Sequence, residues 1–258
     1  MNLSKAIVGT IIVSIFVFIA SITTYSQEVR DIELDAAKIL AQVDKIFQYP
    51  NGLIKGTLKH IKPDGNSFIF QVTGNITKDD FLFTFNSRSR GLLLKVLYKL
   101  QGEDIWVYDA PSLKLFHKLK IDKYDSILTT NFYYIDLSNA DYRSNYQAKV
   151  LGKTMYKGYQ TYRLQLKPLF AGGQYGKLTM YVSTIKYYPL RIDFHDKDMA
   201  IVKFMTISKI KEKAGKIIPL RYDMMDIRQG TVSILYFYDF DHSIKYNKEL
   251  FRSTKLGQ

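Results

Sequence analysis

The chain has 258 residues, of which 47% are hydrophobic, and it carries a formal net charge of +13. This length suits one large domain, and this share of apolar residues is enough to bury a sizeable core. The absence of cysteine excludes disulfides, thiol catalysis, zinc–thiolate sites and lipidation at an N-terminal cysteine. The basic residues are scattered along the chain, so we interpret them as a solvated surface rather than a dedicated polyanion site.

The first 26 residues have the three-part layout of a secretory signal. Lys5 precedes an apolar run that reaches about Ile22, and small or hydroxylated residues follow it, so cleavage after Ser26 is expected. The alternative is a retained inner-membrane anchor, because a run of about 17 residues lies at the lower limit for spanning a bilayer. We therefore expect a signal peptide over residues 1–26 and a periplasmic protein that binds no nucleic acid. Residues 27–258 should form a single domain.

A helix is predicted over residues 33–47, where Ala36, Leu40, Val43 and Phe47 recur at helical spacing. From residue 54 onward the apolar residues recur with a period of two, which is typical of β-strands. Turn-forming residues separate successive strands, so the chain reads as hairpins in sequence, and hairpins in sequence form an antiparallel meander.

This alternation breaks at residues 121–145, a polar connection in which we expect short helical turns at about 123–129 and 136–140. Strands resume at about 146–151 and continue to about 231–240. The pattern predicts a mainly β protein with about eleven antiparallel strands in one large, curved sheet. Its apolar concave face must be covered, and the N-terminal helix and the central connection are the available covers.

The residues that carry chemistry form no recognisable active-site motif. The histidines His60, His117, His195 and His242 do not lie at metal-ligand spacing. The glycine-rich segment at 169–176 matches neither a phosphate loop nor a dinucleotide fingerprint. We therefore predict no cofactor, no metal and no catalytic residue.

What remains unusual is the excess of apolar and aromatic residues on an exported sheet. An apolar concave surface with few polar groups is suited to binding acyl chains, because each buried methylene contributes about 0.8 kcal/mol. Arg88 and Arg90 lie on one strand face, where they can bind a carboxylate or phosphate or simply face solvent as polar residues.

The sequence resembles the outer-membrane lipoprotein-sorting proteins, a LolA-like family, from about Leu34 to Leu256. The resemblance is carried by "YPNGLIKGTLKHIKPDG", "NSRSRGLLLKVLYKLQGEDIWVYDAPSLKLFHKL" and "TNFYYIDLSNADY". It implies a half-closed antiparallel β-barrel plugged by helices, whose hollow receives the acyl chains of a lipoprotein or lipid. It also implies an inner-membrane transporter that supplies the cargo, an outer-membrane acceptor and no covalent chemistry. In such carriers an arginine fastens the closed lid, a role that Arg88 or Arg90 can take here.

The candidates for contact with acyl chains are apolar residues that alternate along the predicted strands. In the hairpin at 102–119, Trp106 and Tyr108 share one face and Ile105 and Val107 share the other, so one pair should line the hollow. The predicted lining residues are Leu58, Phe68, Phe70, Phe81, Phe83, Leu94, Val96, Trp106, Tyr108, Leu164, Ile192 and Ile234.

Two other classes of function stay open. Paired carboxylates among Asp193, Asp196 and Asp239 would suit an envelope hydrolase. A non-lipid adaptor would bind a membrane complex through its basic surface.

Overall fold

The structure is a computed structural model that describes residues 36–138, 141–170, 172–213 and 216–258. The predicted signal peptide lies outside these residues. The described part opens with a helix over residues 36–47, which ends where the sequence predicts. Ala36, Leu40 and Val43 are buried, so the apolar stripe of this helix faces the sheet.

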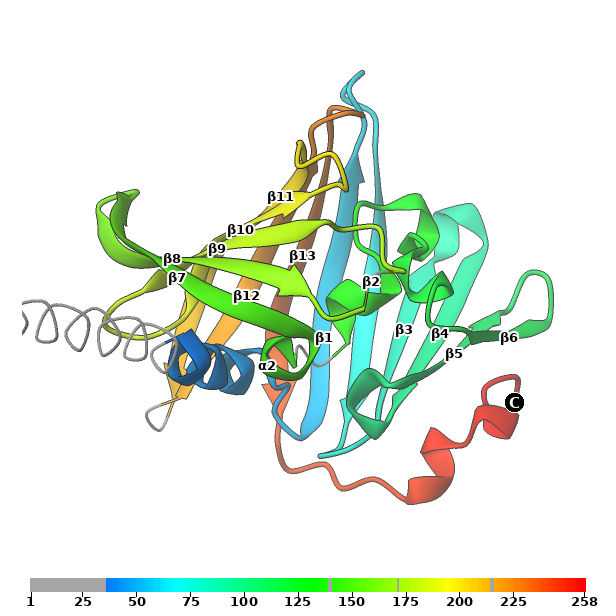
Figure 1. Ribbon diagram of the computed structural model, residues 1–258. Helices are drawn as coiled ribbons and strands as arrows, with labels where there is room; N and C mark the ends of the chain where they lie inside the picture. Colours follow the sequence, from blue (N-terminus) through cyan, green and yellow to red (C-terminus); the bar gives the residue numbers. More distant parts are fainter. Residues whose placement is uncertain (1–35, 139–140, 171, 214–215) are drawn as a thin grey trace, which may run out of the picture.

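The rest of the chain forms one 13-stranded antiparallel sheet, more strands than the eleven or so expected (Figure 1). The strands of the first half are β1 (Gly52–Ile61), β2 (Ser67–Ile76), β3 (Phe81–Ser87), β4 (Leu92–Lys99), β5 (Asp104–Asp109) and β6 (Lys114–Lys118). Those of the second half are β7 (Tyr146–Tyr156), β8 (Tyr159–Pro168), β9 (Lys177–Ser183), β10 (Pro189–His195), β11 (Ile201–Lys213), β12 (Lys216–Asp226) and β13 (Thr231–Asp241).

The strand order is β6-β5-β4-β3-β2-β1-β13-β12-β11-β10-β9-β8-β7. The first and last strands therefore pair in the middle of the sheet, and β6 and β7 form its two free edges. The sheet is curved but not closed, which confirms the predicted fold class.

The connection between the two edges crosses the concave side of the sheet (Figure 1). We call its described residues, 119–138 and 141–145, the plug. Its short helices are η3 (Asp122–Tyr124), η4 (Ile127–Thr129), η5 (Tyr134–Leu137) and α2 (Tyr142–Asn145). A connection between opposite edges of a curved sheet has to pass under it, so the topology itself brings the plug into the hollow.

The core lies between the concave face and its covers, and aromatic rings fill much of it. The rings of Phe81 and Tyr98 stack with centroids 4.6 Å apart, and Tyr49, just beyond the helix, packs edge-on against Phe83 at 5.3 Å. Gly74 makes room for this layer, since a Cβ there would lie 2.7 Å from Cε1 of Phe83. The alternation of strand residues thus supplies one continuous apolar face.

A smaller cluster lies on the opposite, convex face, where the C-terminal residues fold back over β3, β4 and β5. We call it the convex cluster. Its members are Leu82, Leu97, Phe251 and Leu256, with Trp106, Tyr108 and Tyr246 packed against them. Lys95 Nζ, on the same face, donates to the Leu256 carbonyl at 2.7 Å.

Candidate lipid-binding site

The apolar side chains of the plug occupy the concave face. Tyr124, Ile127, Phe132, Tyr134 and Leu137 are buried in the same cluster as the inward residues of the sheet. The plug therefore covers the concave face and buries its apolar side chains against the sheet.

Asn131 anchors the plug to β12 and β13 through buried hydrogen bonds. Its Nδ2 donates to the carbonyls of Met224 at 3.0 Å and Thr231 at 2.9 Å, and its Oδ1 accepts from the Thr231 hydroxyl at 2.8 Å. Its backbone N–H donates to Ser233 Oγ at 2.9 Å, and that hydroxyl lies 2.9 Å from His60 Nδ1. Burial lowers the pKa of His60, which favours the neutral ring in this network.

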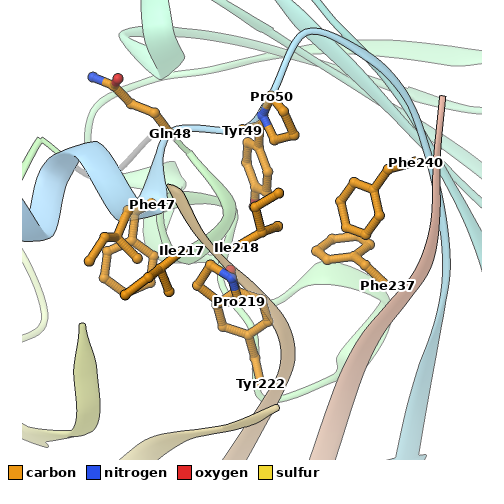
Figure 2. Close-up of a pocket in the computed structure, with 11 residues that line it drawn as sticks. Phe47, Gln48, Tyr49, Pro50, Ile217, Ile218, Pro219, Tyr222, Phe237 and Phe240 are labelled. Carbon is orange, nitrogen blue, oxygen red and sulfur yellow. The ribbon is translucent and has the colours of Figure 1, made fainter. Parts of the chain in front are cut away.

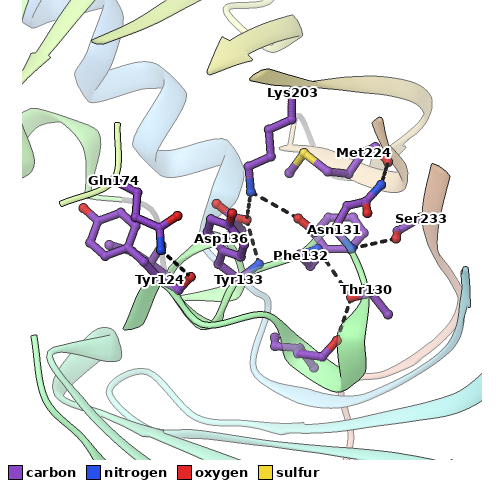
Figure 3. Close-up of polar contacts among 12 residues, drawn as sticks. Tyr124, Thr130, Asn131, Phe132, Tyr133, Asp136, Gln174, Lys203, Met224 and Ser233 are labelled. Carbon is purple, nitrogen blue, oxygen red and sulfur yellow. Dashed lines mark hydrogen bonds and ion pairs between the residues drawn. The ribbon is translucent and has the colours of Figure 1, made fainter. Parts of the chain in front are cut away.

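Lys203 is a second anchor, and it lies on β11 with its side chain 2% exposed (Figure 3). Its Nζ donates to the Asn131 carbonyl at 3.1 Å and to Asp136 Oδ2 at 3.1 Å. The Tyr133 ring centroid lies 3.4 Å from the same ammonium group. Burial lowers the pKa of Lys203, and the charge of Asp136 opposes that shift. A buried ion pair thus joins the sheet to the plug.

The plug is also tied to the N-terminal helix. Asp44 accepts from the backbone N–H of Tyr142 at 2.8 Å and of Arg143 at 3.2 Å, at the start of α2. Burial raises the pKa of Asp44 to about 6, and the two backbone hydrogen bonds oppose that shift. The helix and the plug therefore form one joined cover.

The turn at the tip of the plug is strained. Leu128 and Thr129 have φ angles of 51° and 60°, in the left-handed region that non-glycine residues avoid. Such strain is retained where the surrounding contacts over-determine it. Release of these contacts would relax the turn.

A small apolar pocket opens where the helix ends, beside β12 and β13 (Figure 2). Its volume is about 20 Å³, which is room for about one water molecule and far too little for an acyl chain. It is lined by Ile46, Phe47, Gln48, Tyr49, Pro50, Ile217, Ile218, Pro219, Tyr222, Phe237 and Phe240. As it stands, this pocket is too small to hold an acyl chain.

Most of the predicted lining residues lie on the concave face. Their contact with acyl chains stays a prediction, since the structure shows them packed against the plug and against each other. These residues are Leu58, Phe68, Phe70, Phe81, Phe83, Leu94, Val96, Leu164 and Ile192.

The prediction is wrong for Trp106, Tyr108 and Ile234, which lie on the convex face. Of the two pairs in the hairpin of β5, Ile105 and Val107 are the buried, concave ones, at 0% and 2% exposure. Trp106 and Tyr108 belong to the convex cluster instead. Ile234 alternates with the inward Ser233 and Leu235, so it points outward. Alternation gives two faces but does not say which is concave.

Arg88 and Arg90 do not fasten the plug in this state. They form the exposed turn η1 (Arg88–Arg90), where the guanidinium of Arg90 lies 4.5 Å from the Phe68 ring centroid. Lys203 holds the plug instead. The sequence holds one indication of this position. Lys203 lies two and four residues before Met205 and Ile207 on the same strand, so its side chain points to the same inward face as theirs.

Each of the carboxylates proposed for a hydrolase forms an ion pair with a cation. Asp193 pairs with Arg191 at 2.5 Å, Asp196 pairs with Arg228, and Asp239 pairs with Lys55 at 3.2 Å. Asp193 lies on β10 and Asp239 on β13, with β11 and β12 between them. Asp193 and Asp239 therefore do not lie on neighbouring strands.

The open, curved sheet with its plug defines the class of protein: its fold is LolA-like. An outer membrane lipoprotein-sorting protein domain from Vibrio parahaemolyticus is 19% identical, with a TM-score of 0.76 over 88% of this chain and 100% of that one. A LolA superfamily protein from Nitrosomonas europaea is 18% identical, with a TM-score of 0.71 over 86% and 99%. A DUF1329 family protein from Desulfovibrio piger is 18% identical, with a TM-score of 0.76 over 87% and 99%.

The chain belongs to a family whose description is "Uncharacterized protein" and whose model matches residues 77–258. No curated protein matches the sequence. Within the described residues, which begin at residue 36, no helix combines the length and the apolar character needed to cross a bilayer.

Proposed function

We propose that this protein is a periplasmic carrier that binds the acyl chains of lipoproteins or lipids under its curved sheet and moves them toward the outer membrane. The observation that carries the proposal is the plug, a connection that fills an apolar concave face from edge to edge of the sheet. The LolA-like fold supports the same reading. In this proposal the protein performs no covalent chemistry, receives its cargo from an inner-membrane transporter and delivers it to an outer-membrane acceptor.

Binding requires the plug to exchange places with the guest. The apolar area that the plug uncovers is covered again by acyl chains, so the net cost of exchange is set mainly by the polar anchors, Asn131 and Lys203. The guest needs to supply only enough burial to offset those anchors, at about 0.8 kcal/mol for each methylene. A long acyl chain meets this requirement, whereas a short one does not.

The test is to export and purify the full chain without detergent and to identify bound molecules by native mass spectrometry. We expect acyl lipid to copurify, and we expect a fluorescent fatty-acid probe to bind with an affinity that rises with chain length. A protein that carries no lipid and binds no probe at any chain length would contradict the proposal.

A further inference from the structure

The ammonium group of Lys203 depends on the plug for its polar partners. In the described structure, the hydrogen-bond acceptors of Lys203 Nζ are the Asn131 carbonyl and Asp136 Oδ2, and both belong to the plug. The Tyr133 ring, 3.4 Å away, belongs to it too. The sheet contributes an apolar neighbour, the Phe194 ring, with its centroid at 5.1 Å. If the plug leaves, it therefore takes with it the ion-pair partner of Lys203.

A buried ammonium without a partner is strongly unfavourable, so the open state needs a replacement for Asp136. Water alone is a poor replacement while acyl chains fill the hollow. A neutral guest would leave Lys203 without an ion-pair partner in place of Asp136. An anionic group on the guest would restore the ion pair.

We propose that the guest is an amphiphile with an anionic headgroup, and that its carboxylate or phosphate takes the place of Asp136 on Lys203. This inference rests on the proposed function and names the class of cargo. A diacylglyceryl group has no charge of its own, so the inference favours acidic lipids over the neutral anchors of lipoproteins.

One nearby group can bind the headgroup, and another supports the charge of Lys203. Tyr175, 5% exposed, has a hydroxyl without a hydrogen-bond partner among the described residues, and its ring centroid lies 5.2 Å from Lys203 Nζ. It is a buried donor available to a headgroup oxygen. Asp226, which pairs in register with Lys203, helps to keep the lysine protonated. In the described structure Asp226 accepts from the Gln229 N–H, and the ion-pair partner of Lys203 is Asp136.

The concave face also carries a charged group toward one end and an apolar pocket toward the other, as such a guest requires. Lys203 lies opposite Asp226, at one end of β12, and the apolar pocket lies around Pro219, toward the other end. Pro219 and Asp226 are seven residues apart on this strand, so these ends are about 23 Å apart at about 3.3 Å per residue. That is comparable to an extended long-chain acyl tail. The inward residues between them are Tyr222 and Met224, both buried in the core.

The experiment compares palmitate, hexadecyl phosphate and hexadecanol, which share one chain length and differ in the headgroup. Affinity for the full-length protein is measured by displacement of a fluorescent fatty-acid probe. We expect both anions to bind about tenfold or more tightly than the alcohol, because charge-assisted hydrogen bonds are the stronger ones. The two anions distinguish a carboxylate from a phosphate preference.

The variant that tests Lys203 is the double substitution Lys203→Met with Asp136→Asn, which removes both charges and avoids a lone buried carboxylate. The opening cost changes equally for all three ligands, so the ratio of anion to alcohol affinity isolates the headgroup contact. We expect this ratio to fall to about one, and we expect Asp136→Asn alone to keep it. Lys95→Met, on the convex face, is the matched control and should leave the ratio unchanged.

The outcomes separate this inference from the proposed function. Equal binding of all three ligands to the native protein overturns the headgroup contact and leaves the carrier intact. Binding of none of them overturns the carrier itself. A preference for anions that survives the double substitution assigns the headgroup to another residue and overturns the role of Lys203.

Discussion

The two faces of the sheet are covered in different ways. On the concave face the plug is held by buried polar groups, namely the hydrogen bonds of Asn131 and the ion pair of Lys203 with Asp136. On the convex face the C-terminal residues are held mainly by apolar contacts around Phe251 and Leu256. The polar ties from Lys95 Nζ to this segment, at the carbonyls of Leu256 and Gln258, are partly buried and exposed, respectively.

The difference shows which cover can move. A buried polar anchor has discrete partners, so another group with the same chemistry can replace a partner that leaves. The free-energy cost of losing the partner arises only when the buried group is left unpaired. The convex cluster depends mainly on apolar contacts, so its stability is lost when its apolar area is uncovered. We therefore expect the concave cover to be the functional one and the convex cover to be structural.

The largest expected effect on the concave side is that of Asn131→Ala. It would leave the Met224 and Thr231 carbonyls without donors, and the free energy of unfolding should fall by about 3 kcal/mol. Chemical denaturation measures this change. Asn66→Ala, in an exposed turn, is the control and should stay within about 0.5 kcal/mol. Equal effects of the two substitutions would mean that Asn131 does not anchor the plug.

The corresponding change on the convex side is Phe251→Ala. Phe251 is 2% exposed in a small cluster near solvent, so we expect the free energy of unfolding to fall by about 2 kcal/mol. Affinity for a fatty-acid probe should not change. Leu250→Ala, at a neighbour that is 37% exposed, is the matched control and should be nearly neutral. Loss of probe binding in Phe251→Ala would break the distinction between the two covers.

A smaller effect concerns the tie between the helix and the plug. The pKa of Asp44 rises from 3.8 to about 6 in the folded protein, because burial penalises the carboxylate. Between these values the unfolded chain loses its proton while the folded chain keeps it. The contribution of Asp44 to stability is therefore complete below pH 3.8 and is lost as the pH rises through about 6.

This contribution is measured as the difference in the free energy of unfolding between the native protein and Asp44→Asn across that pH range. We expect the difference to move steadily against the native protein as the pH rises from about 4 to 6 and then to level off. A difference that is independent of pH, or that moves the other way, would contradict the burial of Asp44 against the plug.

The smallest expected effect is on the chain's single tryptophan. Trp106 lies on the convex face, so a brominated fatty acid bound under the sheet should leave its fluorescence unquenched. A Trp106→Phe protein that also carries Phe68→Trp has its reporter on the concave face and should be quenched. Quenching of Trp106 at saturating ligand would place the guest on the convex face instead.

The fold could be predicted largely from the sequence, because the period of two and the turn residues specify an antiparallel meander. The residues of the concave face could be predicted in part, and their contact with acyl chains stays a prediction. Nine of the twelve predicted lining residues lie on the concave face, while Trp106, Tyr108 and Ile234 do not. Strand alternation defines two faces, and only long-range packing decides which one the plug covers. Lys203 was missed for the same reason, since its partners come from a connection far away in the sequence.

The central claim is that a guest takes the place of the plug, and hydrogen exchange tests it most directly. In the closed state the Asn131 N–H donates to Ser233 Oγ at 2.9 Å, and the Ile127 N–H donates to the Phe132 carbonyl at 2.8 Å. We predict that saturation with palmitate increases exchange at these plug amides and leaves the amides around the convex cluster unchanged. Stoichiometric binding of palmitate with full protection of the plug would contradict the account.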